Sequence, residues 1–217
     1  MLTIENLHAS YSQRVVLQGI DLQVKAGEVV TLCGRGGSGR STLLKVLMGV
    51  HPLDSGTILY EGELGFCSIS AYPAFSRARL GIVWLPETKA LFTDLTAEEN
   101  LLLALKAFGG FLQKSWRGEL YAIYERYPIL ATRARVAAGV LSGGEQQLLA
   151  FARSMIVAGK ARFFLLDEPA EGLAETWVKE VSEHLEELKN EGKAIVMIEE
   201  KMQISQVLGA RAFNLNR

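Results

Sequence analysis

Several features of membrane, secreted and nucleic-acid-binding proteins are missing from this sequence. Two cysteines in 217 residues, Cys33 and Cys67, cannot build a disulfide framework, and we expect both to be reduced thiols in a cytosol. Apolar runs such as 163–166 are too short to span a membrane. Residues 1–5 lack the basic and apolar regions of a signal peptide. With 23 basic and 24 acidic residues, the near-neutral charge gives no reason to expect nucleic acid as a partner.

The composition is that of a folded chain. Hydrophobic residues make up 49% of the sequence and charged residues 22%, which excludes an intrinsically disordered protein. The length allows one large core, or a core with a smaller appended unit. No internal repeat or low-complexity segment is visible.

A glycine-rich loop follows the apolar run 29–33 and precedes the helical pattern 43–48. The loop consists of Gly34, Arg35, Gly36, Gly37, Ser38, Gly39, Arg40, Ser41 and Thr42. In a strand–loop–helix context the glycines let backbone N–H groups converge on a phosphate, and the helix dipole adds positive charge. The hydroxyl of Ser41 falls where it would hold Mg²⁺, but Arg40 stands where the pattern asks for lysine. A simple turn is the alternative interpretation.

Apolar periodicity predicts strands that alternate with helices. The predicted strands are 2–9, 15–24, 29–33, 57–60, 81–85, 162–166 and 194–198, and the predicted helices are 40–50, 74–80, 96–108, 113–127, 129–137, 145–158 and 175–191. The pattern over 63–78 is ambiguous, and its short helix is expected to carry two arginines outward. The stretch 96–140 is expected to be an all-helical insertion within an α/β domain. Such alternation implies a parallel sheet with ligands at the carboxyl ends of its strands.

Three further features of the sequence could carry chemistry. Tyr11, expected in a polar turn, is either a strand-end aromatic on the core or a platform for an adenine ring. Asp167 and Glu168 end a fully apolar strand, where Asp167 suits Mg²⁺ and Glu168 could orient or deprotonate a water; solvated turn residues are the alternative. The segment 142–144 precedes a helix and could bind a second anion. Two such loops suggest a dimer in which each loop meets the other chain's phosphate.

The segment 141–147 reads Leu-Ser-Gly-Gly-Glu-Gln-Gln and stands between the glycine loop and the acidic pair. In this order the motifs resemble the nucleotide-binding subunits of ABC transporters over nearly the whole chain. The resemblance implies an α/β fold: a P-loop NTPase core with a mostly parallel sheet and flanking helices, an N-terminal antiparallel β-subdomain and an inserted helical subdomain. The core with its β-subdomain would comprise 1–86 and 159–217, and the helical, signature-bearing subdomain 87–158.

The resemblance also assigns roles, with ATP and Mg²⁺ as cofactors. Tyr11 and the loop 34–42 would bind ATP. The residues facing the ATP of a second ATPase subunit would be Ser142, Gly143, Gly144 and Glu145. The Mg²⁺ ligands would be Ser41, Glu87 and Asp167. The catalytic residues would be Glu168, as base, and Glu200, which occupies the position of the family's switch histidine.

Three segments, 85–87, 92–101 and 170–174, resemble importers of branched-chain amino acids, amides or urea. That resemblance implies a peripheral subunit at the cytoplasmic face of the membrane, paired with a second ATPase subunit, in a homodimer or heterodimer. Transmembrane permease subunits would dock in a groove near Glu87 and the helices at 96–127, and an extracytoplasmic binding protein would deliver solute. A DNA-repair or chromosome-organising ATPase is disfavoured, because the insertion is too short for long coiled coils and nothing suggests zinc or nucleic acid.

Two departures from the family pattern leave two hypotheses. Arg40 keeps the charge of the expected lysine but is wider and planar. Glu200 places a carboxylate where it would repel a phosphate. The chain is therefore either an active ATPase subunit or a subunit with an impaired site that completes its partner's site.

Overall fold

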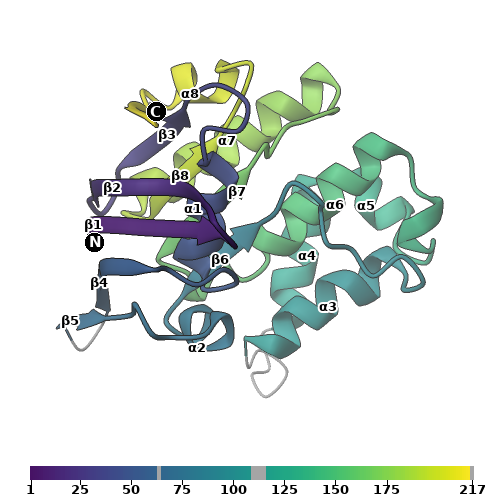
Figure 1. Cartoon of the computed structure of the whole chain (residues 1–217). Helices are drawn as coiled ribbons and strands as arrows, with labels where there is room; N and C mark the ends of the chain where they lie inside the picture. The colour runs from purple at the N-terminus through teal and green to yellow at the C-terminus, as the bar shows by residue number, and fades with distance from the viewer. Residues whose placement is uncertain (63–64, 109–115, 216–217) are drawn as a thin grey trace.

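The computed structural model describes residues 1–62, 65–108 and 116–215. Two β-sheets and a group of helices make up the molecule, and Figure 1 shows α3, α4, α5 and α6 gathered on the side away from strands β1, β2 and β4. The predicted α/β class, with an antiparallel sheet, a parallel sheet and a helical insertion, is confirmed. Among the helices of the described residues, none has the length and apolar character needed to cross a membrane.

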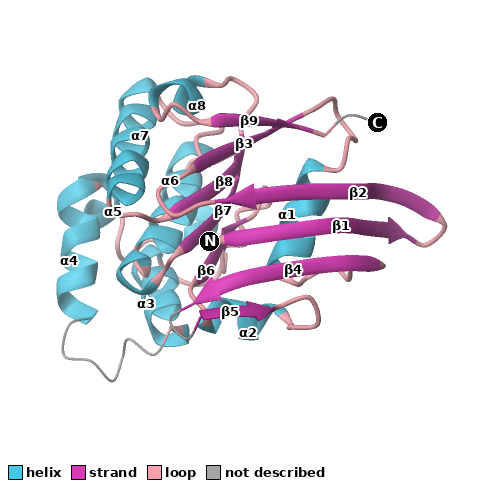
Figure 2. Cartoon of the chain, turned by 90° about the vertical axis from the view of Figure 1, so that its left-hand side faces the viewer, coloured by secondary structure: helices cyan, strands magenta, loops and turns pink. Residues whose placement is uncertain are grey.

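The first sheet is antiparallel and has the strand order β2-β1-β4-β5. Its strands are β1 (Leu2–Tyr11), β2 (Arg14–Val24), β4 (Ser55–Gly62) and β5 (Gly65–Ser68). One face of this sheet is apolar, because alternate residues of β1 such as Leu2 and Ile4 are buried. Figure 2 shows α1 behind these strands, and α1 contacts strands of both sheets.

The second sheet is parallel, with strand order β6-β7-β8-β3-β9. Its strands are β3 (Val29–Cys33), β6 (Ile82–Leu85), β7 (Phe163–Asp167), β8 (Ala194–Ile198) and β9 (Arg211–Asn214). Alternate side chains enter different cores: Phe163 and Leu165 join the core under α1 and the antiparallel sheet, and Phe164 and Leu166 join the core under the helices. A strand covered on both faces has to be largely apolar, and β7 is apolar from Phe163 to Leu166, with Asp167 as its last residue.

The helices flank the parallel sheet or belong to the insertion. They are α1 (Arg40–Met48), α2 (Ala74–Arg79), α3 (Ala97–Ala107), α4 (Trp116–Arg126), α5 (Pro128–Thr132), α6 (Gly143–Met155), α7 (Glu175–Asn190) and α8 (Gln203–Val207). The capping box predicted at α3 is present, since Thr96 and Glu99 exchange hydrogen bonds. The first predicted residues of the 113–127 helix, 113–115, lie outside the described part of the chain.

Two predictions about helices are wrong. The piece predicted as helical over 129–137 ends at Thr132, because the carbonyls of Ala134 and Val136 accept the N–H groups of Glu98 and Ala97 at the start of α3. These N–H groups have no acceptor within their own helix, so the extended segment satisfies them. In α2, Arg79 is exposed as predicted, but Arg77 points inward and is only 2% exposed.

Candidate functional site

The glycine loop connects the carboxyl end of β3 to the first turn of α1. Glycine is required at two positions by close contacts as well as by backbone angle: a Cβ on Gly34 would lie 2.5 Å from Ser38 Oγ, and one on Gly39 would lie 2.7 Å from Leu17 Cδ2. Both glycines have positive φ, at 152° and 100°. A Cβ on Gly36 or Gly37 would meet nothing within 4 Å, so the outer face of the loop is open.

The loop lines a cavity of about 370 Å³. The lining residues are Tyr11, Arg14, Val16, Gly37, Ser38, Gly39, Arg40, Ser41 and Thr42. Ser38 Oγ is buried and, within the described residues, has no hydrogen-bond partner. A buried hydroxyl without a partner, beside the unpaired N–H groups of a helix N-terminus, fits a phosphate ligand. Arg14 and Val16 were not predicted, because an alternating strand gives no sign of which residues face a ligand.

Tyr11 shares this cavity. It is the last residue of β1 and pairs with Arg14, so the prediction that it lies in a turn is wrong. Its ring stacks on His51 with centroids 4.2 Å apart, and His51 Nε2 lies 3.0 Å from the carbonyl oxygen of Ser10. The side chain remains 42% exposed. The geometry therefore brings an aromatic ring, held from behind, to the same cavity as the glycine loop.

Asp167 ends β7 beside the start of α1. Its carboxylate is buried and hydrogen-bonds to the side chain of Ser41. Burial, with a smaller contribution from the charge of Glu87, raises the pKa of Asp167 to about 6, although the Ser41 hydrogen bond, Lys45 and Arg40 lower it. These electrostatic effects place Ser41, Glu87 and Asp167 in one neighbourhood. Lys45 was not predicted; it lies one helical turn beyond Ser41, the spacing that puts two residues on one face of α1.

Glu168 has a left-handed backbone conformation, with φ at 49°. Its N–H donates to the carbonyl of Ile198 at 3.0 Å, and its own carbonyl accepts from Nε2 of Gln147 at 2.8 Å. The backbone N–H of Glu200 donates to the Glu168 carboxylate at 3.2 Å. Burial, together with the charges of Glu200 and Asp167, raises the pKa of Glu168 to about 7, against the lowering effects of the Glu200 N–H and Arg40. A carboxyl with this pKa can exchange a proton near neutral pH.

The two glutamates after β8 have different environments. Glu199 is buried, and its carboxylate accepts from the N–H of Ile204 and from the N–H and hydroxyl of Ser205 at the start of α8. Glu200 is exposed and lies next to Glu168. Only Glu200 of this pair therefore reaches the acidic site.

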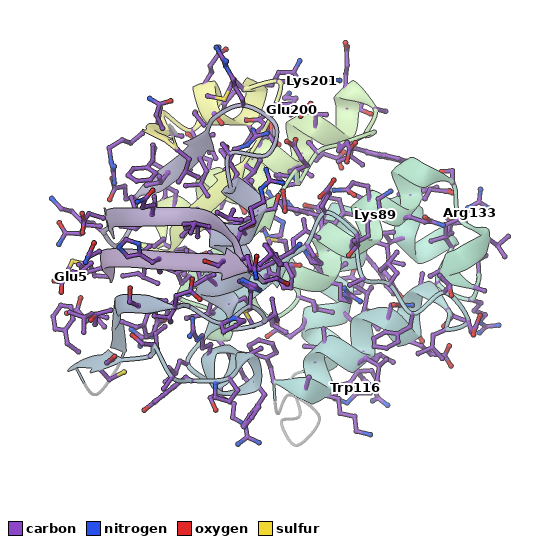
Figure 3. The ribbon with its side chains drawn as sticks, viewed as in Figure 1. Glu5, Lys89, Trp116, Arg133, Glu200 and Lys201 are labelled. Carbon is purple, nitrogen blue, oxygen red and sulfur yellow. The ribbon has the colours of Figure 1, made fainter. Side chains whose placement is uncertain are left out.

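The segment 142–145 begins α6. Ser142 caps the helix and forms a capping box with Glu145, whose carboxylate also accepts from Nε of Arg133 at 2.9 Å. Two hydrogen bonds lower the pKa of Glu145: the larger effect comes from the backbone N–H of Ser142 and the smaller from Arg133. Figure 3 shows Arg133 among the helices, away from the sheets. The Glu145 carboxylate is thus engaged within its own chain, while Ser142 and Gly143 are exposed.

Glu87 lies in the loop between β6 and α3, and hydrogen bonds connect this loop to α6. Lys89 and Ala90 both have positive φ, at 62° and 49°. Arg153 of α6 donates to both of their carbonyls, at 2.9 and 2.6 Å, and Lys89 Nζ donates to the carbonyl of Gly143 at 3.2 Å. Within the described residues, no three His, Cys, Asp or Glu side chains gather as a metal-binding group. A metal ion at Asp167 would therefore need the Ser41 hydroxyl, a nucleotide or water among its ligands.

The comparisons with known proteins agree with this geometry. Residues 17–171 match the family model described as ABC transporter. The chain is 36% identical to the high-affinity branched-chain amino acid transport ATP-binding protein BraG of Pseudomonas aeruginosa, over 99% of this chain and 88% of that protein. It is 29% identical to the lipopolysaccharide export system ATP-binding protein LptB of Escherichia coli, over 98% of this chain and 85% of that protein.

Solved structures show the same fold. The structure of an ATP-binding subunit of an ABC transporter superposes with a TM-score of 0.83 at 25% identity, covering 95% of this chain and 82% of the other. A dimeric ATP-binding cassette in a post-hydrolysis state bound to ADP and Pi superposes with a TM-score of 0.82 at 21% identity, over 95% of this chain and 91% of the other. With its glycine loop, acidic strand end and capped signature helix, the chain belongs to the ABC transporter family, as one of its ATP-binding, ATP-hydrolysing subunits.

Proposed function

We propose that this chain binds and hydrolyses Mg-ATP at the cavity of the glycine loop to drive solute import. One observation carries the proposal: the buried carboxylate of Asp167 is hydrogen-bonded to Ser41, and Glu168, next in sequence, has its pKa raised to about 7. The phosphates would lie on the backbone N–H groups of 34–42 and near Ser38 Oγ, with adenine stacked on Tyr11. Ser41, Asp167 and Glu87 would hold Mg²⁺, which neutralises phosphate charge when bound.

In this scheme the residues of the chain divide the work. Glu168 orients or deprotonates the attacking water, a role that suits a carboxylate half-shielded from solvent. Arg40 supplies positive charge at the loop, as its effect on the pKa values of Asp167 and Glu168 indicates. Glu200 would contribute through its backbone N–H, which holds the Glu168 carboxylate.

The site would be completed by a second ATPase subunit. No residue of the segment 142–145 lines the cavity at 34–42, although Ser142 and Gly143 are exposed. The N–H groups of a helix N-terminus exposed in this way can donate hydrogen bonds to the phosphates of a nucleotide bound to a facing chain. We propose that the core and β-subdomain (1–86 and 159–217) present the glycine loop, and the helical subdomain (87–158) presents the signature to the partner.

The transported solute is proposed to be a branched-chain amino acid, an amide or urea, on the strength of the similarity to BraG. Transmembrane permease subunits would anchor the chain at the cytoplasmic face, and an extracytoplasmic binding protein would deliver the solute. An apolar hollow of about 260 Å³ on α3, lined by Leu95, Glu99, Leu102, Leu103 and Lys106, suits a permease helix. Phe92, in the loop before α3, is 55% exposed, while Trp84 and Trp116 pack against the cores.

A second candidate function is a hydrolysis-impaired subunit that binds ATP and completes its partner's site. The charge of Glu200 favours it, because that charge raises the pKa of Glu168 and would also repel a γ-phosphate. Arg40 favours it as well, since a planar guanidinium fills the space under the loop differently from a lysine ammonium.

The test measures equilibrium Mg-ATP binding and turnover of the wild type, Arg40→Lys and Glu168→Gln. We expect ATP binding by all three and turnover by the wild type, with turnover reduced about 100-fold or more in Glu168→Gln. If the wild type binds ATP but turns over only after Arg40→Lys, the second candidate is supported. Absence of binding in both the wild type and Arg40→Lys would refute the proposed role of residues 34–42.

A further inference from the structure

Gln147 makes a contact that the proposed reaction does not use. It lies in the second turn of α6, on the helix that Ser142 caps, and it is only 2% exposed. Its amide reaches across to the acidic site and donates to the backbone carbonyl of Glu168 at 2.8 Å. A buried amide needs partners, and this one takes the carbonyl of the proposed catalytic glutamate.

The backbone of Glu168 needs such a contact. A left-handed conformation is unfavourable for a residue with a side chain, and it persists only where the surroundings fix it. Three hydrogen bonds hold this backbone: the Glu168 N–H donates to the carbonyl of Ile198, and the Glu168 carbonyl accepts from the N–H of Glu171 at 3.2 Å and from the amide of Gln147. The N–H of Glu200 holds the carboxylate instead. Of the backbone contacts, only that of Gln147 comes from the helix that bears the signature.

A second contact joins α6 to the segment that follows Glu168. A Cβ on Gly144 would lie 3.1 Å from the carbonyl oxygen of Gly172 and 3.4 Å from Cζ3 of Trp177. The first turn of α6 therefore lies directly against residues 172–177. A displacement of this turn cannot leave the segment after β7 unaffected, because packed elements move together.

We propose that Gln147 is a positioning residue, which fixes the backbone of Glu168 to the signature helix of the same chain. The carboxylate of Glu168 then depends on where residues 142–144 stand, and so on whether a facing subunit's nucleotide holds them. This inference rests on the proposed function. It adds that helix α6 connects two parts of one chain, the signature at residues 142–144 and the acidic site at Glu168, through the side-chain amide of Gln147.

The experiment compares the wild type with Gln147→Met, which keeps the shape of the side chain but cannot donate. Ser154→Ala is the matched control, because it also removes a buried donor to a backbone carbonyl on α6, at Ala150. Steady-state turnover is measured over a range of Mg-ATP concentrations. Amide hydrogen exchange of the segment 168–173 is measured on the same samples, with and without ATP.

We expect Gln147→Met to lower kcat by about 10- to 100-fold and to leave KM within about twofold, because the loop and Tyr11 still bind ATP. Exchange in 168–173 should become faster, and Ser154→Ala should show neither effect. Wild-type kcat and wild-type exchange in Gln147→Met would overturn the proposal, as would a change confined to KM. If the wild type binds ATP without turnover, the hydrolysis proposal fails while the exchange measurement still decides the role of Gln147.

Discussion

At the scale of single residues, His184 of α7 is a half-buried imidazole. Its Nδ1 lies 2.9 Å from the hydroxyl of Tyr127, and its ring packs against Tyr127 and Phe151. Burial, with a smaller contribution from the charge of Arg126, lowers the pKa of His184 to about 4. The side chain is therefore neutral in the folded protein at pH 7, and its contribution to stability is present above the ordinary pKa of about 6.5.

This contribution should be lost between about pH 6.5 and pH 4, because the unfolded chain binds a proton that the folded chain excludes. We expect His184→Gln to flatten the pH dependence of the unfolding free energy, by about 2 kcal/mol between pH 7 and pH 4.5. Urea unfolding of both proteins at several pH values measures this. Asp167 and Glu168 change stability in the opposite direction over this range, since their pKa values are raised, but they cancel in the comparison. Parallel curves for the two proteins would contradict the assignment.

At the scale of elements, α1 carries the glycine loop at one end and is held at the other by Arg77. The guanidinium donates to the carbonyls of Val46 and Leu47 in the last turn of α1, at 2.7 and 2.8 Å, and to those of Tyr72 and Ser70. Burial lowers the pKa of Arg77 to about 10, which still leaves it charged at neutral pH. A cation at this position also complements the negative end of the helix dipole.

Replacing Arg77 should leave several buried carbonyls without a donor. We expect Arg77→Met to lower the unfolding free energy by about 3 kcal/mol, whereas the exposed neighbour Arg79→Met should change it by less than about 0.5 kcal/mol. Chemical unfolding followed by far-UV circular dichroism gives both values. Equal midpoints for the two variants would show that the carbonyls find other donors.

Sequence patterns predicted this architecture where the signal is local. The glycine loop, the capping box at Thr96 and the apolar strand before Asp167 each depend on neighbouring residues, and each is present. Strand β9 and helix α8 were not predicted. Strand β9 has four residues and pairs with β3, far away in sequence, and helix α8 has only five residues. The inward turn of Arg77 was also missed, since it depends on carbonyls in another helix.

At the scale of the whole molecule, α4 of the insertion is attached to α7 of the parallel-sheet core. Arg126 and Glu187 form a bidentate ion pair with both N–O distances at 2.6 Å. Arg126 lowers the pKa of Glu187, and the Glu187 side chain is 56% exposed. A pair this exposed to water is expected to contribute modestly.

A double-mutant cycle tests the pair. We expect Arg126→Gln and Glu187→Gln to couple by about 0.5–1 kcal/mol, and the coupling to shrink in high salt, because mobile ions screen an exposed pair. The cycle is measured by urea unfolding at low and high ionic strength. Additive effects at both salt concentrations would mean that the ion pair does not stabilise the attachment of α4 to α7.

The two cores that meet at the parallel sheet have a consequence for how this chain can change over generations. Odd and even positions of β7 belong to different cores, as Phe163 and Phe164 do. A substitution in β7 changes the packing of one core only, so the residues on the two sides of the sheet can evolve separately. An insertion or deletion of one residue moves each side chain of β7 into the opposite core, and the packing of both cores is then lost. Descendants of this chain should therefore vary freely in which apolar residue each position carries, and hardly at all in the length of β7.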